Sequence, residues 1–509
     1  MSRRRRLTRV LAAIAVLAAG SGLLAACGGG GAGGDGSGGG QNLTVAPGTF
    51  PVALDVHEWS AEAAVAGPMQ HVMETLVARN GEEFVPELAE SWTNPDELTW
   101  VFTLRSGVTF SDGTPLTAED VRASAQRLID IEGSLAPLWA QVESVEATDE
   151  HTLTVTTSQP LGTLLSTMTL LYIGQAGKME SEDYWRSPIG TGPYVVSEYL
   201  PDQKLTLSRN EKYRGERPTL DTITYTNMPE EAARITALST GEVDYVGGIG
   251  ADSVAQVESM DGVTYEAKPG WSYFFNWFNS SREPFDDPRV RQAMWYAVDV
   301  KSIVEDLFGS QAVLARAPIP QDVFGAPALE PYPYDPEKAK QLLAEAGYPD
   351  GFTTSLQWSA SSGDSMTSFA QAFISAWANV GVTVEPLPKE RAVWLEDLNS
   401  LNWDMNLQGN TVATGDADYT LGRLYLCSAD RNGYCNPELD KLLNQAKASL
   451  DPKERIELYR QAAQIMWSDA VGIFPADRTV SAAYRNTLQN VQLEPSGRES
   501  FVGVSIAAD

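Results

Sequence analysis

Histidine side chains, which supply the base of many hydrolases and the ligands of many metal sites, are scarce in this chain. The 509 residues include only His57, His71 and His151. The sequence has no GxSxG, HExxH or GxxxxGK[ST] motif, and no GxGxxG turn follows an expected strand. We therefore expect no histidine-based catalytic site, no metal site and no cofactor.

Carboxylates are the plentiful reactive groups of the sequence. The chain has 67 Asp and Glu residues, and a hydrolase needs only one pair of them at a suitable separation. Because the sequence does not give that separation, a secreted carboxylate hydrolase stays open as an alternative. Turnover of a bound ligand would distinguish it from a protein that only binds.

Tryptophan is present in excess, with 13 residues. Most of them are expected in the core, but a broad ring with one N–H donor also suits the wall of a ligand cleft. Trp59, Trp271 and Trp403 lie in polar or irregular stretches, and we predict that they line such a cleft. The alternative for each of them is ordinary packing.

The first 27 residues have the pattern of an export signal. A basic run, Arg3–Arg6, precedes an apolar run from about Val10 to Leu24 that is short for a membrane span. The sequence Leu24-Ala25-Ala26-Cys27 resembles the lipobox of bacterial lipoproteins. That resemblance implies a lipoprotein signal peptide over residues 1–26 and acylation of Cys27, for example with palmitate.

Residues 27–41 then form a Gly-rich tether, which suits a folded body held away from a membrane. The expected location is outside the cell, lipid-anchored to the outer face of the cytoplasmic membrane, on the cell surface or the periplasmic side. A plain signal peptide cut near Ala26 and an N-terminal anchor helix are the alternatives. Arg4-Arg5 loosely resembles a twin-arginine signal, so the export route stays open.

Two further cysteines, Cys427 and Cys435, lie near the end of the chain. In an exported protein this pair is expected to form a disulfide that closes a small loop, although spacing alone does not prove the pairing. A metal pair is the lesser alternative. No His flanks the two thiols, and two ligands are too few for a structural zinc.

The charge balance narrows the range of partners. There are 37 Lys and Arg residues against 67 Asp and Glu residues, a net charge of −30. Removal of the leader, which carries five arginines, makes the mature chain more negative still. A field of that sign repels phosphate backbones and anionic lipid, so nucleic-acid binding is disfavoured.

Strand-like and helix-like stretches alternate after residue 41. In residues 98–104 the apolar side chains of Leu98, Trp100, Phe102 and Leu104 share one face, which is typical of a half-buried strand. A turn around Gly113 follows. Thr117, with an acid three residues later, then favours the start of a helix.

Three Asp-Pro pairs predict helix starts at Asp287, Asp335 and Asp451, because Asp accepts from free N–H groups and Pro needs no N–H there. Gly309 and Gly347 stand where helices are expected to end. The mixed elements predict several α/β domains. The last helix is expected to turn a stripe toward the core, comprising Ile456, Tyr459, Ala462, Ala463 and Met466.

The run PELAESWTNPDELTWVFTLRSGVTFSDGTPLTAEDV at residues 86–121 is highly specific. It closely resembles the bacterial solute-binding proteins of the peptide/nickel type, family 5, cluster C. Shorter motifs extend the match over residues 42–509. Members of that family deliver ligands to ABC importers. The shorter motifs lie at residues 189–194, 210–213, 237–244, 284–293 and 334–348.

The resemblance implies an α/β fold of the two-lobed periplasmic-binding-protein type (type II, cluster C), with a hinge of two crossing segments and an extra subdomain in the first lobe. A ligand would be enclosed between the lobes by hinge closure. The implied function is substrate binding for an ABC importer, and not catalysis. By analogy, lobe I comprises residues 42–56, 189–275 and 478–509, its extra subdomain residues 57–188, and lobe II residues 276–477.

The cargo is less clearly marked than the family. Peptide-binding members often carry Gly-Trp and, three residues after the Trp, an Asp that pairs with the peptide ammonium. In the corresponding stretch of this chain, Asn410 stands in place of the Trp and Ala413 in place of the Asp. This alignment is supported by Cys427 and Cys435, which match a cysteine pair in dipeptide-type members. A buried ammonium without a carboxylate is costly, so we expect Asp416 or another acid to replace it, or a ligand without an ammonium.

A peptide or peptide-like solute is the main expectation for the ligand. An oligosaccharide or another neutral polar solute is the alternative, because neutral donors and acceptors beside tryptophan rings suit hydroxyl-rich cargo. Nickel fits worst, since three scattered His make a poor site. Arg391 is a candidate for a ligand carboxylate or a solvated surface charge. The predicted ligand-binding set is Trp59, Trp271, Tyr273, Trp403, Asn410, Thr411 and Asp416.

The expected partners follow from this role. We expect a small-molecule or oligopeptide ligand, a separately encoded permease and ATPase, and contact with the membrane through the lipid anchor. The protein itself is expected to be a monomer. A surface adhesion or chaperone-like module is a further alternative, which would bind macromolecules without closing on small solutes.

Overall fold

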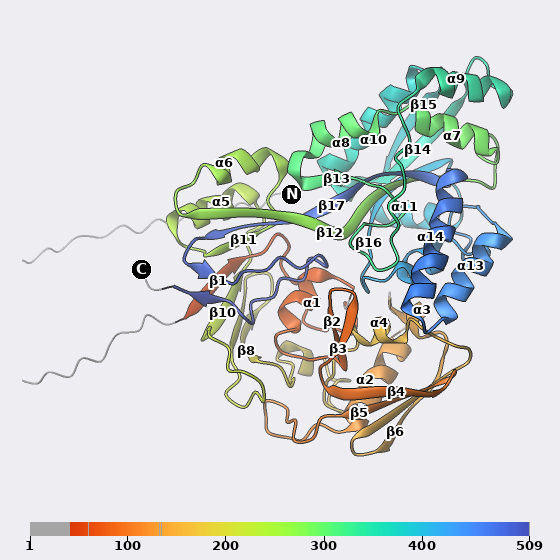
Figure 1. The fold of residues 1–509 in the computed structure, drawn as a ribbon. Coiled ribbons are helices and arrows are strands. Elements are labelled where there is room, and N and C mark those ends of the chain that lie inside the picture. Colours follow the sequence, from red (N-terminus) through yellow and green to blue (C-terminus); the bar gives the residue numbers. More distant parts are fainter. Residues whose placement is uncertain (1–40, 60, 132, 134, 508–509) are drawn as a thin grey trace, which may run out of the picture. The chain divides into compact units, whose positions relative to one another are not determined.

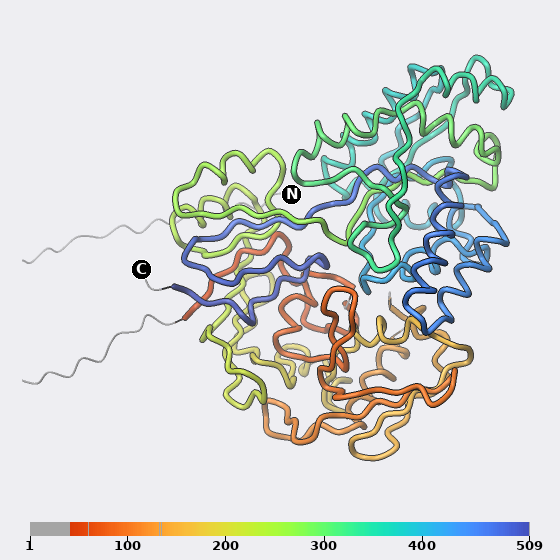
Figure 2. The backbone as a smooth tube through the Cα atoms, viewed as in Figure 1, coloured from red at the N-terminus to blue at the C-terminus, as the bar shows by residue number. Residues whose placement is uncertain are grey.

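The computed structural model describes residues 41–507 except residues 60, 132 and 134 (Figures 1 and 2). The expected signal peptide, Cys27 and the tether up to residue 40 lie outside the described residues. The folded body forms one compact unit. Within the part that the structure describes, no helix has the length and apolar character needed to cross a membrane.

One mixed sheet of 11 strands extends through the folded body. Its two long strands, β12 (Val263–Phe278) and β17 (Gly472–Arg485), are antiparallel neighbours at its middle. The strand order is β15-β14-β16-β12-β17-β11-β1-β10-β9-β8, with β13 also paired to β17. In Figure 1, β12 and β17 run from the group around β1 and β11 to the group around β14 and β16. They are therefore the segments that cross between the two halves of the body.

The first half surrounds β1, which pairs in parallel with β10 and β11. Its buried apolar side chains come from both ends of the chain, since Leu43 and Phe501 share one cluster. This half comprises β1 (Asn42–Ala46), α1 (Ala63–Met69), β8 (Tyr194–Leu200), β9 (Lys204–Arg209), β10 (Thr222–Thr226), α5 (Glu231–Thr240), β11 (Tyr245–Gly247), α6 (Val254–Glu258), β18 (Leu488–Gln489) and β19 (Ser505–Ile506).

A separate antiparallel sheet, in the order β4-β5-β7-β6, packs with α2 around its own core. We refer to residues 70–188, which hold this sheet, as the small-sheet region. Its elements are β2 (Val77–Asn80), β3 (Glu83–Pro86), β4 (Ala89–Asp96), β5 (Thr99–Leu104), α2 (Ala118–Asp130), α3 (Ala136–Trp139), β6 (Val142–Asp149), β7 (Thr152–Thr157) and α4 (Leu164–Met168).

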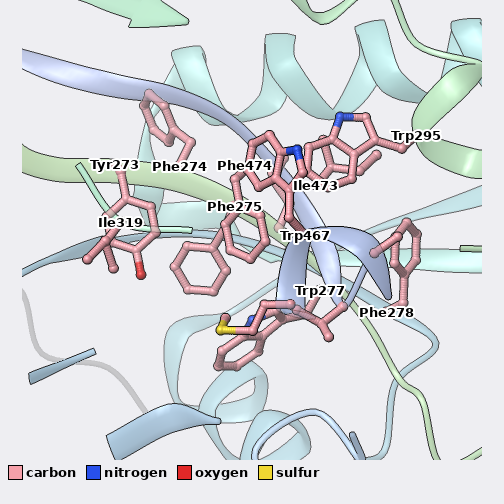
Figure 3. Packing of buried hydrophobic residues seen from close by; sticks show 14 of the residues in the cluster. Tyr273, Phe274, Phe275, Trp277, Phe278, Trp295, Ile319, Trp467, Ile473 and Phe474 are labelled. Carbon is pink, nitrogen blue, oxygen red and sulfur yellow. The ribbon is translucent and has the colours of Figure 1, made fainter. Parts of the chain in front are cut away.

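The second half holds the largest hydrophobic core, which surrounds the end of β12 (Figure 3). Tyr273 and Phe274 extend to opposite sides of this strand, as successive side chains of a strand must. The elements here are α7 (Pro288–Tyr296), α8 (Val300–Phe308), β13 (Ala312–Leu314), α9 (Pro336–Glu345), β14 (Thr353–Ser359), α10 (Asp364–Ala378), β15 (Thr383–Lys389), α11 (Arg391–Asn399), β16 (Met405–Thr411), α12 (Leu421–Leu424), α13 (Pro437–Ala448) and α14 (Pro452–Ser468).

Most local sequence signals are confirmed. Thr117 caps α2, because the Asp120 carboxylate accepts from the backbone N–H and the hydroxyl group of Thr117 at 2.9 Å each. The three Asp-Pro pairs begin α7, α9 and α14, and in each case the Asp side chain accepts a backbone N–H. Gly309 and Gly347 have the positive φ that ends a helix.

Two apolar side chains that were predicted to face the core are exposed. Leu98 is 38% exposed, because β5 begins only at Thr99 and Leu98 belongs to the preceding turn. Ile456 is 37% exposed on the first turn of α14, whose buried side begins with Arg455 and Tyr459. The exact lobe boundaries stay a prediction. Leu135 and Leu170, from the predicted extra subdomain, pack into the core of the second half.

Candidate functional site

Two cavities lie where the crossing strands meet the halves of the body. Cavity A has a volume of about 580 Å³ and is lined by the loop after β1 and by α1, β12, β16 and β17. Cavity B has a volume of about 650 Å³ and is lined by the small-sheet region, the stretch 321–324, the stretch 413–415 and the stretch 494–502. Both volumes are in the range of small-molecule sites.

The C-terminal stretch separates the two cavities. Ser496 lines both of them. The backbone N–H of Trp271 donates to the Pro495 carbonyl at 2.8 Å, which fixes this stretch on β12. Gln70, just after α1, donates from its side chain to the Glu499 carbonyl at 3.0 Å. Cavities A and B are therefore neighbours divided by a single strip of backbone.

Two of the predicted ligand-binding residues face these cavities. Thr411 lines cavity A, where its hydroxyl group lies 2.7 Å from that of Ser272. Trp271 lines cavity B and donates from its indole N–H to the Asp322 carbonyl at 3.2 Å. A Cβ atom on Gly415 would lie 2.5 Å from the Trp271 ring, and Gly415 has a φ of +65°. The Trp271 ring therefore packs against Gly415, at a position that requires glycine.

Tyr273 and Asn410 lie behind the cavity walls. Tyr273 is 1% exposed, its ring stacks on Phe275 at 5.2 Å, and burial raises the pKa of its hydroxyl group to about 12. Asn410 donates from its side chain to the Thr420 hydroxyl group at 3.4 Å. Neither residue lines cavity A or cavity B.

Trp59 and Trp403 are not brought to the cavities. Trp403 is 3% exposed, stacks on Trp277 and donates from its indole N–H to the Leu398 carbonyl at 3.3 Å. It belongs to the core of the second half. Trp59 is 36% exposed and lines neither cavity. Polar neighbours in the sequence therefore did not indicate a place on the wall of cavity A or cavity B for these two residues.

The Asp416 carboxylate is fully engaged by protein groups. It is 1% exposed, and one Nη atom of Arg455 lies 2.8 Å and 2.9 Å from its two oxygens. The Ser166 hydroxyl group donates to it at 2.9 Å, and the Asp418 N–H at 3.1 Å. Although burial opposes the charged form, Asp416 helps to raise the pKa of Arg455 above its usual value. Asp416 is thus part of an internal ion pair.

Ala413 lines cavity B, at the position where the resemblance implies a contact with a peptide ammonium. Its carbonyl oxygen accepts from the Arg498 guanidinium at 3.2 Å. Ala413 itself has no carboxylate with which a ligand ammonium could pair. Four acids line other parts of the same cavity: Glu82, Glu87, Asp322 and Glu494.

Several charged residues of the cavities were missed by the sequence analysis. Arg79 and Glu87 line cavity B, and Arg478 lines cavity A. Burial, with the nearby Glu74, raises the pKa of Glu87 to about 7. Each residue stands alone in its stretch of sequence, so no spacing pattern could have revealed it. Arg391 lies exposed at the start of α11 and lines neither cavity.

The two buried histidines have structural partners. His57 Nε2 lies 2.6 Å from the Tyr172 carbonyl, and His71 accepts the Phe501 N–H at 2.9 Å. Burial lowers the pKa of both imidazoles to about 4. No group of three or more His, Cys, Asp or Glu side chains among the described residues is arranged to hold a metal ion. Cys427 and Cys435 form a disulfide in the structure.

Comparison with known proteins gives a consistent picture. The family model described as bacterial extracellular solute-binding proteins, family 5 Middle, matches residues 83–432. Heme-binding protein A of Haemophilus influenzae is 30% identical over 503 residues, which cover 91% of each chain. The glutathione-binding protein GsiB of Escherichia coli is 29% identical over 422 residues, 78% of this chain and 82% of that protein.

Solved structures agree with these relatives. HbpA2 from Haemophilus parasuis aligns with a TM-score of 0.82 and 26% identity, covering 92% of this chain and 100% of that chain. The periplasmic binding protein DppA from Helicobacter pylori, in complex with the peptide STSA, aligns with a TM-score of 0.77 and 25% identity. That alignment covers 92% of this chain and 98% of that chain. The expected two-lobed α/β fold is confirmed.

Proposed function

Because the chain belongs to the bacterial extracellular solute-binding proteins of family 5, we propose that it captures a peptide or peptide-like solute between its lobes and delivers it to an ABC permease. Proteins of this family bind substrates for import and are not enzymes, as expected from the sequence. The proposal on the ligand class draws on relatives and structural neighbours, one of which was solved with a bound peptide.

The single observation that carries the proposal is the position of cavities A and B at the crossing strands. Each cavity takes walls from both halves of the body, so a ligand bound there would contact both lobes at once. A ligand that contacts both lobes binds the closed arrangement more tightly than the open one, and it therefore shifts the protein toward the closed arrangement. Cavities of about 580 and 650 Å³ have room for a short peptide or another small solute.

The contact with a peptide ammonium is proposed away from Ala413. Asp416 was the replacement suggested by the sequence, but its oxygens already accept from Arg455, Ser166 and Asp418. Other acids of the cavity walls are candidates instead, such as Glu494 in cavity B and Glu62 in cavity A, whereas Glu87 already accepts from Thr75. Trp271 and Thr411 stay in the proposed ligand-binding set, because they line the cavities, whereas Trp59, Trp403, Tyr273 and Asn410 line neither cavity.

The cellular setting is also part of the proposal. Members of this family are extracellular or periplasmic, and the leader favours a lipoprotein anchored through Cys27 to the outer face of the cytoplasmic membrane. The disulfide between Cys427 and Cys435 suits that oxidising location. The mature protein would act as a monomer that meets its permease and ATPase as separate chains.

A thermal-shift screen tests the proposal. The mature protein would be heated with pools of di- to tetrapeptides and, in parallel, with neutral oligosaccharides. A ligand at a hundred times its Kd should stabilise the protein by about 2.7 kcal/mol. Stabilisation by peptides alone is the expected result, and stabilisation by sugars alone would move the ligand class to the neutral alternative.

A further inference from the structure

Arg478 is an exposed cation on the wall of cavity A. It lies on the crossing strand β17, and its guanidinium carbon is 5.3 Å from the ring centre of Phe274, which lines the same cavity. Among the residues that the structure describes, its side chain has no ion pair and no hydrogen bond to a carboxylate. Its setting therefore differs from that of Arg455, which is neutralised by Asp416.

The surroundings of Arg478 restrict what pairs with it. Arg478 is exposed to solvent at the cavity, although protein atoms packed around the guanidinium lower its pKa through burial. Neutral hydroxyl and amide groups of Ser272, Gln311 and Thr411 line the same cavity. A guanidinium on a cavity wall without a carboxylate partner favours an anion, and its planar fork matches a carboxylate.

The acids of cavity A belong to the other half of the body. Glu62 lies just before α1, Glu231 begins α5, and Glu499 is in the C-terminal stretch. Glu231 accepts the Gly250 N–H at 2.9 Å, and burial raises the pKa of Glu499 to about 7. None of the three forms an ion pair with Arg478 in the structure. Cavity A therefore has acids on the first-lobe side and a lone cation on the crossing strand.

We propose that Arg478 binds a carboxylate of the captured solute and makes a free carboxylate a requirement for tight binding. This inference rests on the proposed function and adds the substrate chemistry to it. In a protein with a net charge of −30, an anionic group is repelled over most of the surface, so a local cation is needed to hold it. A neutral saccharide would leave the guanidinium without a partner.

The test compares free-acid peptides with their C-terminal amides. Binding of matched pools of di- to tetrapeptides would be measured by thermal shift, and the tightest member by calorimetry, for wild type, Arg478→Gln, Arg478→Lys and Arg391→Gln. Loss of a charge-assisted bond predicts about 10- to 100-fold weaker binding of the free acid to Arg478→Gln. The amide should bind weakly to wild type and lose little in the variant.

The controls separate this inference from the proposed function. Arg391→Gln removes an exposed arginine outside both cavities and should bind like wild type, and Arg478→Lys should retain part of the affinity. Equal binding of acid and amide by wild type, which requires no variant to fold, would overturn the role of Arg478 and leave peptide capture standing. A pool of non-peptide carboxylates is screened in parallel, and binding of that pool alone, weakened in Arg478→Gln, would support Arg478 and contradict peptide capture. Binding of neither class would overturn both.

Discussion

Ser166 and Asp416 are 250 residues apart in the sequence, and the Ser166 hydroxyl group donates to the Asp416 carboxylate at 2.9 Å. The same hydroxyl group accepts from Arg79 at 3.2 Å. The bond thus joins α4 of the small-sheet region to the second half of the body. Nearby, the Gly162 N–H donates to the Lys447 carbonyl at 2.8 Å, a second bond between the same two parts. These contacts join the small-sheet region to the second half in this structure, and we expect them to form when the lobes close.

Removal of the Ser166 hydroxyl group should weaken closure. In Ser166→Ala the closed arrangement loses one hydrogen bond to a charged group, so the Kd for the ligand should rise by about tenfold. Calorimetry measures the Kd, and small-angle scattering measures the closed fraction. Ser239→Ala is the matched control, because Ser239 bonds only within α5, to the Thr236 carbonyl. Equal affinity of Ser166→Ala and Ser239→Ala would contradict a role of Ser166 in closure.

The ion pair between Asp416 and Arg455 should be a major contributor to stability. Asp416→Asn leaves the Arg455 charge without its partner, and breaking a buried pair in this way costs about 3 to 5 kcal/mol of the free energy of unfolding. Urea unfolding measures this loss in the free energy of unfolding. The comparison is Glu457→Gln, which breaks an exposed pair with Arg460 and should have little effect. Similar midpoints for both variants would contradict this assignment.

Asp477 should make the protein less stable as the pH rises. It is 1% exposed, one of its oxygens has no hydrogen-bond partner among the described residues, and burial raises its pKa to about 8. The folded-state pKa lies above the unfolded value of about 3.9, so the stabilising contribution is present below about pH 4 and is lost as the pH rises through about 8.

The variant Asp477→Asn tests this dependence. It should gain stability over wild type with rising pH, by about 2 to 5 kcal/mol at pH 9 and by almost nothing near pH 4. Urea unfolding at pH 4, 6 and 9 measures the difference. Exposed Asp350→Asn serves as the control and should show no such trend. A constant difference between wild type and Asp477→Asn at all three pH values would show that Asp477 does not titrate in this range.

Anchoring should depend on Cys27. Wild type should partition with membranes and incorporate labelled palmitate, whereas Cys27→Ser should do neither, because the acyl chains provide the membrane affinity. Ser21→Ala, in the same leader, should behave like wild type. Labelling followed by fractionation measures both properties. Palmitate incorporation into Cys27→Ser at the level of wild type would contradict lipidation at this position.

Local signals of the fold were predictable, because caps, turns and alternation act over a few residues. Thr117, the three Asp-Pro pairs and Gly309 are in this class, and the family motifs indicated the two-lobed fold. The ends of amphipathic stretches were not predictable in this way. Leu98 and Ile456 continue the apolar periodicity of their elements but lie where the element turns away from its core.

Only part of the site was predictable. Trp271 and Thr411 reach the cavities, whereas Asp416 is engaged by Arg455, 39 residues later, and by Ser166 from a distant segment. Sequence spacing cannot show that two distant partners satisfy a carboxylate. The same limit applies to Arg478, since its lack of a carboxylate partner is a property of the folded cavity.

Native mass spectrometry of the purified mature protein, before and after mild unfolding, tests the central claim most directly. We expect the folded protein to carry a bound solute that is released on unfolding, and we expect its mass and fragmentation to identify short peptides or peptide-like compounds with a free carboxylate. Release of a neutral sugar would contradict the proposed ligand class. Absence of any released solute, together with no thermal shift from peptide or sugar pools, would contradict solute capture itself.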